Sequence, residues 1–143
     1  APRPDAGAAA RAIRMALNES GYSDDERLYI NAHGTGTLLN DKAETTAIKT
    51  ALGEESAHKA AISSTKSMMG HMLGAAGAVE LVVCALALES GIIPPTIGLT
   101  DPDPECDLDY TPQTARRFDP QVAISNSLGF GGHNACVALR KWE

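Results

Sequence analysis

Apolar residues recur at helical spacing in three blocks of the chain. In the first block, Asp5 is placed to cap a helix and Gly21 to end it. In the second, Asn40 is placed to cap a helix that ends at Gly53. The third block, about residues 72–90, is apolar nearly all round, so we expect other elements to cover this helix on most sides. The positions expected to face inward in the first two helices are Ala9, Ile13, Ala16, Leu17, Ala43, Ala47, Ile48, Ala51 and Leu52.

Shorter apolar runs between and after these blocks predict strands. The last two runs are separated by a glycine-rich turn, which predicts an antiparallel pair. Residues 92–120 are rich in proline and acidic residues and predict a long surface segment. Because helices and strands alternate, we expect an α/β fold with a mostly parallel sheet and helices on its faces. The predicted strands are 28–32, 60–63, 121–126 and 133–140.

The composition narrows the possible functions. The chain has 143 residues, 43% hydrophobic and 21% charged, which fits one folded domain. Its formal net charge of -6 argues against a nucleic-acid or anionic-membrane partner, since both attract basic surfaces. Three cysteines without C-x-x-C spacing predict a cytoplasmic protein with reduced thiols. Glu80 interrupts the longest apolar stretch, which predicts a buried helix of a soluble protein and no membrane span.

Glycine-bearing loops follow three of the predicted strands. The carboxyl ends of parallel strands meet at the ligand crevice of an α/β sheet, so these loops could bring His33, Lys66, His71 and the Phe130 amide into one pocket. Two imidazoles and an ammonium would supply donors for a developing oxyanion and a source of protons. The alternative for each histidine is a hydrogen-bonded structural residue, and for Lys66 a solvated loop position.

The chain does not contain a complete phosphate-binding, dinucleotide-binding or metal-binding motif. Residues 129–132 are rich in glycine but lack the Lys-Ser/Thr pair and the following helix of a phosphate loop. Residues 34–36 lack the third glycine of a dinucleotide fingerprint. No histidine or cysteine spacing indicates zinc, and prolines interrupt the acidic residues between 101 and 109, which favours a solvated loop over a calcium site.

Three long motifs occur in order along the chain: Asn-Ala-His-Gly-Thr-Gly-Thr at 31–37, Ser-Ser-Thr-Lys-Ser-Met-Met-Gly-His at 63–71 and Asn-Ser-Leu-Gly-Phe-Gly-Gly at 126–132. Together they resemble the elongating β-ketoacyl-acyl-carrier-protein synthases, in particular the 3-oxoacyl synthase II type of dissociated fatty acid synthesis. The resemblance implies the C-terminal half of the thiolase-like fold, a mixed five-stranded sheet layered with helices, incomplete at its N-terminus. We expect the first strand of that half to be absent, together with the N-terminal half that carries the nucleophilic cysteine in this family.

The resemblance implies an acyltransferase that lengthens an acyl chain by two carbons. Malonyl-acyl carrier protein would lose carbon dioxide, and the resulting carbanion would attack an acyl group held on the cysteine. His33 and His71 would donate hydrogen bonds to the malonyl thioester oxygen, and Lys66 would favour the neutral imidazole. The Phe130 amide would form half of an oxyanion hole. None of the chain's own cysteines matches the nucleophile.

The resemblance also implies a possible structural monovalent cation, while no cofactor is required. Asn31, Glu44, Glu80 and Ser125 match positions that surround such an ion in some family members. Glu80 lies within an apolar helix, and a buried carboxylate needs a partner. That partner could equally be a salt bridge or a set of hydrogen bonds.

The partners implied by the resemblance are acyl carrier protein bearing acyl and malonyl groups, the missing N-terminal half, and a second copy in a homodimer of the intact enzyme. Two alternatives share the same residues: a non-catalytic ketosynthase-like partner subunit, and a ketosynthase of polyketide assembly. We expect the isolated chain to be inactive. We also expect it to expose an apolar surface larger than the ~300–600 Å² patch of an ordinary monomer.

Overall fold

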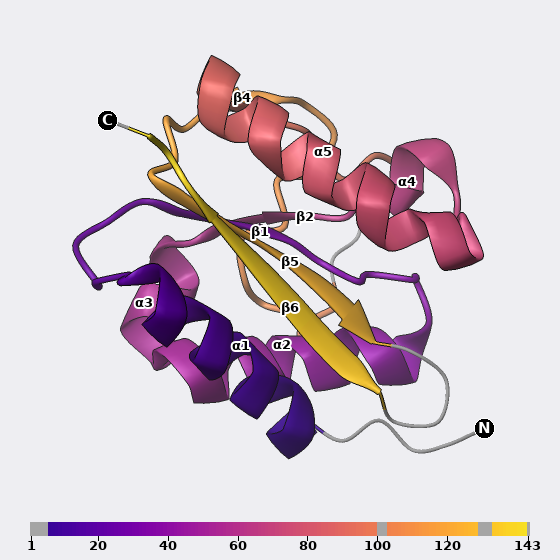
Figure 1. Ribbon diagram of the computed structural model, residues 1–143. Helices are drawn as coiled ribbons and strands as arrows, with labels where there is room; N and C mark the ends of the chain where they lie inside the picture. Colours follow the sequence, from indigo (N-terminus) through magenta and orange to yellow (C-terminus); the bar gives the residue numbers. More distant parts are fainter. Residues whose placement is uncertain (1–5, 100–102, 129–132, 143) are drawn as a thin grey trace.

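A four-stranded mixed sheet lies at the centre of the molecule, whose computed structural model describes residues 6–99, 103–128 and 133–142 (Figure 1). Its strands are β1 (Leu28–Asn31), β2 (Ala61–Ser63), β5 (Val122–Leu128) and β6 (Asn134–Arg140), in the order β2-β1-β5-β6. β1 runs parallel to β2 and β5, whereas β6 runs antiparallel to β5. The mostly parallel sheet and the antiparallel pair are therefore confirmed. The described residues supply four strands of the five-stranded sheet that the resemblance implies.

Helices lie on both faces of the sheet (Figure 1). On one face, α1 (Ala6–Ser20) packs against α2 (Leu38–Leu52), and α3 (Glu54–Lys59) follows α2. On the other face lies α5 (Ala76–Ser90), which follows the short α4 (Lys66–Met69) and the 3-10 turn η1 (Leu73–Ala75). A small second sheet pairs β3 (Ile92–Ile93) with β4 (Arg116–Arg117) in antiparallel fashion. The result is three layers with the sheet in the middle.

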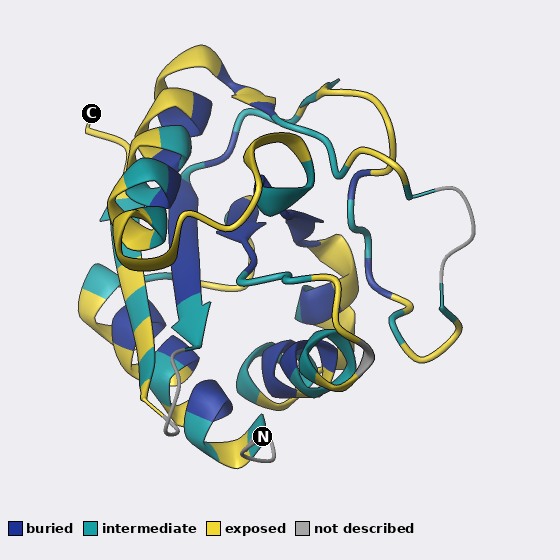
Figure 2. Ribbon diagram, turned by 90° about the vertical axis from the view of Figure 1, so that its right-hand side faces the viewer, coloured by how far each residue is buried: buried dark blue, intermediate teal, exposed yellow. Residues whose placement is uncertain are grey.

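The central strands send alternate side chains into two separate cores, as a period of two residues requires. Figure 2 shows the central strands and the inward sides of the helices as buried. The core between the sheet and α1 and α2 includes Ile13, Leu17, Ile30, Ile48, Ile62 and Ile124. The core between the sheet and α5 includes Tyr29, Ala61, Cys84, Ala87, Leu88 and Ala123.

The first helix follows the predicted pattern, whereas in the second Ala47 and Ile48 are buried but Ala43, Ala51 and Leu52 are only partly buried. In α1 the predicted inward positions Ala9, Ile13, Ala16 and Leu17 are buried, whereas Asp5 lies outside the described residues. α2 begins at Leu38, two residues before the predicted cap. Thr37 is the last extended residue there, and its carbonyl already accepts the Asp41 N–H at 3.0 Å. The sequence pattern did not predict α3.

The outer side of α5 is exposed, so the prediction that other elements cover this helix on most sides is wrong. Its buried residues are Glu80, Cys84, Ala87 and Leu88. Val82 and Leu86, by contrast, are 58% and 56% exposed. The sheet packs against one side of the helix only.

One described stretch, Leu73–Ser90, is long and apolar enough to cross a membrane by length and composition, with 28% of it buried. A helix that packs in a protein core passes the same test. Here Glu80 lies within the stretch and forms an ion pair with Lys66. The stretch is therefore weak support for a membrane span.

Candidate active site

The loops that follow β1 and β2 bring three predicted residues together at the carboxyl end of the parallel strands. His33 lies two residues beyond the end of β1. Lys66 is the first residue of α4, just after β2, and His71 follows α4. The rings of His33 and His71 meet edge to face, with their centroids 5.8 Å apart and their planes at 89°. Phe130, the fourth predicted residue, lies outside the described residues.

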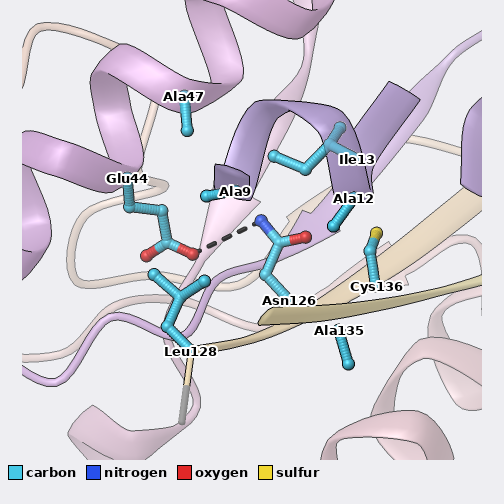
Figure 3. A pocket seen from close by; sticks show the side chains of 9 residues that line it. All are labelled: Ala9, Ala12, Ile13, Glu44, Ala47, Asn126, Leu128, Ala135 and Cys136. Carbon is cyan, nitrogen blue, oxygen red and sulfur yellow. Dashed lines mark hydrogen bonds between the residues drawn. The ribbon is translucent and has the colours of Figure 1, made fainter. Parts of the chain in front are cut away.

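The backbone of the His33 loop is held by a buried carboxylate. Glu44, on α2, accepts the N–H of His33 at 2.8 Å and the N–H of Gly34 at 2.9 Å. Figure 3 shows the same carboxylate directed at Asn126 of β5, whose side-chain amide donates to it at 3.3 Å. Burial raises the pKa of Glu44. This residue therefore fixes the loop from the side of the sheet that faces α1 and α2.

His33 is half-buried, and its surroundings disfavour the charged imidazolium. Burial lowers its pKa to about 4, and the nearby Lys66 and His71 act in the same direction. At neutral pH the ring is therefore neutral. A neutral imidazole carries one N–H donor, which suits it to donate to an oxygen that is becoming negative.

His71 lies on the exposed side of the pair and has its tautomer set by the backbone. The N–H of Leu73 donates to Nδ1 of His71 at 3.0 Å. Because Nδ1 accepts, the proton of the neutral ring is on Nε2. Nε2–H is thus the donor that His71 can offer to a ligand.

Lys66 forms a buried ion pair with Glu80 of α5. The side chains are only 6% and 3% exposed, and Nζ of Lys66 contacts Oε1 of Glu80. The ammonium is thus held by Glu80, while its charge still lowers the pKa of His33. A salt bridge was one of the three partners considered for Glu80 from the sequence, with a cation and a set of hydrogen bonds as the others.

The four predicted cation residues do not share one side of the sheet. Asn31 and Ser125 are paired in register on β1 and β5 and lie on the side that faces α5, which carries Glu80. Oδ1 of Asn31, Oε2 of Glu80 and Oγ of Ser125 are buried without a hydrogen-bond partner. Glu44 lies on the opposite side, where both of its oxygens accept hydrogen bonds. Among the described residues, no cluster of three histidine, cysteine or acidic side chains could hold a metal.

Two buried polar residues near the site were missed from the sequence. Tyr29 on β1 shares a hydrogen bond of 2.7 Å with Ser63 and accepts one from Asn31 at 3.2 Å. Asn126 anchors Glu44 in a hollow too small for a water molecule (Figure 3). Both are polar residues within apolar strand runs, and that pattern was the available signal.

A cavity of about 590 Å³, a size typical of ligand pockets, is lined by His71 and by Gly34, the residue after His33. Its walls come from the loop after β1, from the segment that carries Lys66 and His71, and from residues between 96 and 112. Cys106 lines this cavity, and none of the chain's three thiols has a lowered pKa. Burial raises the pKa of Cys84 and of Cys136 to about 12, and that of Cys106 is also raised, chiefly by burial.

Comparison with known proteins identifies relatives of the whole chain. Residues 1–100 match the family described as "Beta-ketoacyl synthase, C-terminal domain". The 3-oxoacyl-[acyl-carrier-protein] synthase 2 of Synechocystis sp. is 52% identical over 143 residues, which cover 100% of this chain and 34% of that protein. The tetracenomycin polyketide synthase ketoacyl synthase alpha subunit of Streptomyces glaucescens is 48% identical over 139 residues, 97% of this chain and 32% of that subunit. The chain therefore spans about a third of the curated relatives it matches.

Solved structures agree with the sequence relationship. A β-ketoacyl synthase from Burkholderia phymatum superposes with a TM-score of 0.90 at 37% identity, over 99% of this chain and 34% of that one. The ketosynthase in the AntDE:AntF complex, described as a type II polyketide synthase acyl-carrier protein bound to its ketosynthase, gives a TM-score of 0.91 at 41% identity. That match covers 98% of this chain and 35% of the other. The thiolase-like fold is thereby confirmed, and the chain belongs to the β-ketoacyl synthase family, whose C-terminal domain it carries.

Proposed function

We propose that this chain works as the C-terminal part of a condensing enzyme of fatty acid synthesis. The enzyme would decarboxylate malonyl-acyl carrier protein and join the product to an acyl chain held on a cysteine elsewhere in the protein. The observation that carries the proposal is the edge-to-face pair of His33 and His71. His71 lines a cavity of about 590 Å³, and burial keeps His33 neutral.

In the proposed reaction, the bond between the malonyl carboxylate and the α-carbon breaks and carbon dioxide leaves. The electron pair moves into the thioester, so negative charge builds up on its carbonyl oxygen. His33 and Nε2–H of His71 would donate to that oxygen. Such preorganised donors stabilise the enolate more than the uncharged thioester, and each is worth about 2.7–4 kcal/mol in comparable sites.

The enolate carbon then attacks the acyl thioester. A new carbon–carbon bond forms, and the cysteine leaves as a thiolate that later takes up a proton. The Phe130 amide, together with the backbone amide of that cysteine itself, would stabilise the tetrahedral oxyanion. Lys66 would act through its charge, because it stays paired with Glu80 and disfavours protonation of His33.

Three of the four candidate cation residues would suit a structural monovalent cation. The unpartnered oxygens of Asn31, Glu80 and Ser125 are hard donors of the kind that such ions bind. Glu44 would not contribute, since its oxygens are engaged by the His33 loop. A bound cation would balance charge among these oxygens and take no part in the chemical steps. A rise in melting temperature in potassium or sodium over choline at equal ionic strength, lost in Ser125→Ala, would support this site.

Acyl carrier protein is the proposed partner, because the related ketosynthase of the AntDE:AntF complex is described as bound to one. We further propose that the intact enzyme is a homodimer and works in the cytoplasm. Assembly of polyketides is the second candidate function. The 48% identity to the tetracenomycin polyketide synthase subunit supports polyketide assembly as this second candidate.

The test is release of labelled carbon dioxide from malonyl-acyl carrier protein by the full-length protein that contains this chain. Decarboxylation that falls about 10²–10³-fold in His71→Ala is the expected result. Elongation of saturated acyl groups would support fatty acid synthesis, and elongation of polyketide chains alone would support the alternative. The isolated chain should form no condensation product. No decarboxylation by the full-length protein would overturn the proposal.

A further inference from the structure

We propose that Ser64 is a positioning residue that sets the separation of the two histidines by locking the His33 loop to the segment that carries Lys66 and His71. The inference rests on the proposed function, which it deepens by naming a residue that touches neither substrate nor the reacting atoms. Ser64 is the residue after β2 and is 6% exposed.

The first half of this lock is a close contact between Ser64 and Gly34. The hydroxyl of Ser64 donates to the Gly34 carbonyl at 2.6 Å. A Cβ placed on Gly34 would lie 2.6 Å from both Cβ and Oγ of Ser64, so only glycine permits this approach. Gly34 also has φ +39°, which other residues rarely adopt. The turn directly after His33 is therefore pressed against Ser64.

The second half of the lock connects Ser64 to the start of α4. The Ser64 carbonyl accepts the hydroxyl of Ser67 at 2.7 Å and the backbone N–H of Ser67 at 3.2 Å. Ser67 lies next to Lys66 in the first turn of that helix. Through one residue, the His33 loop and the Lys66 segment thus share a common anchor.

A third segment of the chain holds the anchor in place. The Ser64 N–H donates to the Thr96 hydroxyl at 3.1 Å, and that hydroxyl donates to the Tyr110 carbonyl at 2.7 Å. The Ile97 N–H donates to the Ser67 hydroxyl at 2.9 Å. The hydroxyls of Thr96 and Ser67 each accept one bond and donate one, so the donors and acceptors of this network match.

The network matters for catalysis because two donors must reach the same oxygen. A displacement of about 1 Å in a catalytic group can cost about 100-fold in rate. Without its hydroxyl, residue 64 would leave the Gly34 carbonyl unpaired, and the turn after His33 would lose its tie to α4. Glu44 would still hold the N–H groups of His33 and Gly34, so the loop would shift without unfolding.

The experiment compares Ser64→Ala, Gly34→Ala and the double variant in the full-length protein that contains this chain. Ser64→Ala should lower the kcat for decarboxylation about 10–100-fold with little change in KM. It should also shift the signals of His33 and His71 in the NMR spectrum of ¹³C-labelled histidine. If both residues act through one contact, the double variant should lose much less than the product of the two single losses.

Ser20→Ala is the matched control, since it removes another partly buried serine hydroxyl that bonds a backbone carbonyl at 2.8 Å, at the end of α1. The control should leave both kcat and the histidine signals unchanged. A Ser64→Ala protein with unshifted histidine signals overturns the inference, whether or not its rate changes. The NMR measurement does not depend on turnover. If the wild-type protein shows no decarboxylation, the proposed function is refuted, and the NMR comparison still tests the role of Ser64.

Discussion

The two sides of the central sheet differ in what they bury. Towards α1 and α2, the strands present isoleucines to a closed apolar core, beside which Glu44 and Asn126 form a hydrogen bond. Towards α5, the same strands present Tyr29, Asn31, Ser63 and Ser125, close to the Lys66–Glu80 ion pair. One side therefore supports the fold, whereas the other concentrates polar groups beneath the histidines.

A residue on the apolar side of the sheet also positions a residue of the candidate active site. Glu44 belongs to the apolar side, yet its carboxylate fixes the backbone of His33 at the end of β1. On the polar side, unpartnered oxygens and a buried ion pair cost stability unless other groups compensate them. Substitutions on the two sides should accordingly have different consequences.

The largest effect is expected at the buried ion pair. Glu80→Ala would leave the Lys66 ammonium buried without a partner and should lower the free energy of unfolding by about 3–5 kcal/mol. Urea denaturation measures this, with Glu89→Ala on the exposed side of the same helix as control. Replacing both residues by apolar ones, Lys66→Met with Glu80→Leu, should recover most of the loss. A Glu80→Ala loss below about 1 kcal/mol would show that the pair is not isolated from water.

A smaller effect is expected in the apolar core. Ile124 is fully buried towards α1 and α2, so Ile124→Val should cost about 0.5–1.5 kcal/mol in the free energy of unfolding. The histidine NMR signals of the Ile124→Val variant should match those of the wild type, because the lost methylene lies on the side of the sheet opposite the histidines. Shifted histidine signals would mean that packing around Ile124 also positions the histidines.

The next prediction concerns the dependence of stability on pH. His33 has a folded-state pKa near 4, below its ordinary value of 6.5, so the unfolded chain binds more protons between these values. Stability should therefore fall as the pH drops from about 6.5 to 4. His33→Gln should remove this part of the slope. Glu44, whose pKa is raised, changes the pH dependence of stability in the opposite direction. Because Glu44 is present in both proteins, its effect cancels when the His33→Gln curve is subtracted from that of the wild type. Parallel stability curves for the two proteins would contradict the burial of a neutral imidazole.

The smallest effect on stability is expected at the outer side of α5. Leu86 is 56% exposed, so Leu86→Gln should change the free energy of unfolding of this chain by less than about 0.5 kcal/mol. The same change should reduce binding of a hydrophobic dye and self-association of the isolated chain. Unchanged dye binding and sedimentation would refute the prediction of an exposed apolar surface.

Local patterns were enough to predict much of the fold. Helical spacing identified the inward face of α1, alternation of elements predicted the parallel strands, and the glycine-rich turn predicted the antiparallel β5–β6 pair. Their order predicted that His33, Lys66 and His71 lie at one end of the sheet. In the structure the two imidazole rings are 5.8 Å apart, and the charge of Lys66 acts on His33. These features depend on periodicity and on the rule that parallel strands end on the same side.

Long-range contacts were not predictable in this way. Glu44 lies one helical turn before Ile48, so spacing alone shows that it faces inward but not which backbone groups its carboxylate meets. The contact of Ser64 with Gly34 spans 30 residues and depends on how two loops pack. The exposed side of α5 was misjudged because an apolar sequence does not reveal what covers it.

The most direct test of the account compares decarboxylation of malonyl-acyl carrier protein by His33→Ala, His71→Ala and the double variant of the full-length protein. If the two imidazoles act on one oxygen, the rate of decarboxylation should fall about 10²–10³-fold in each single variant. In the double variant it should fall by far less than the product of the two single decreases. If the two losses of rate multiply in the double variant, or if His33→Ala leaves the rate unchanged, the two imidazoles do not act on one oxygen.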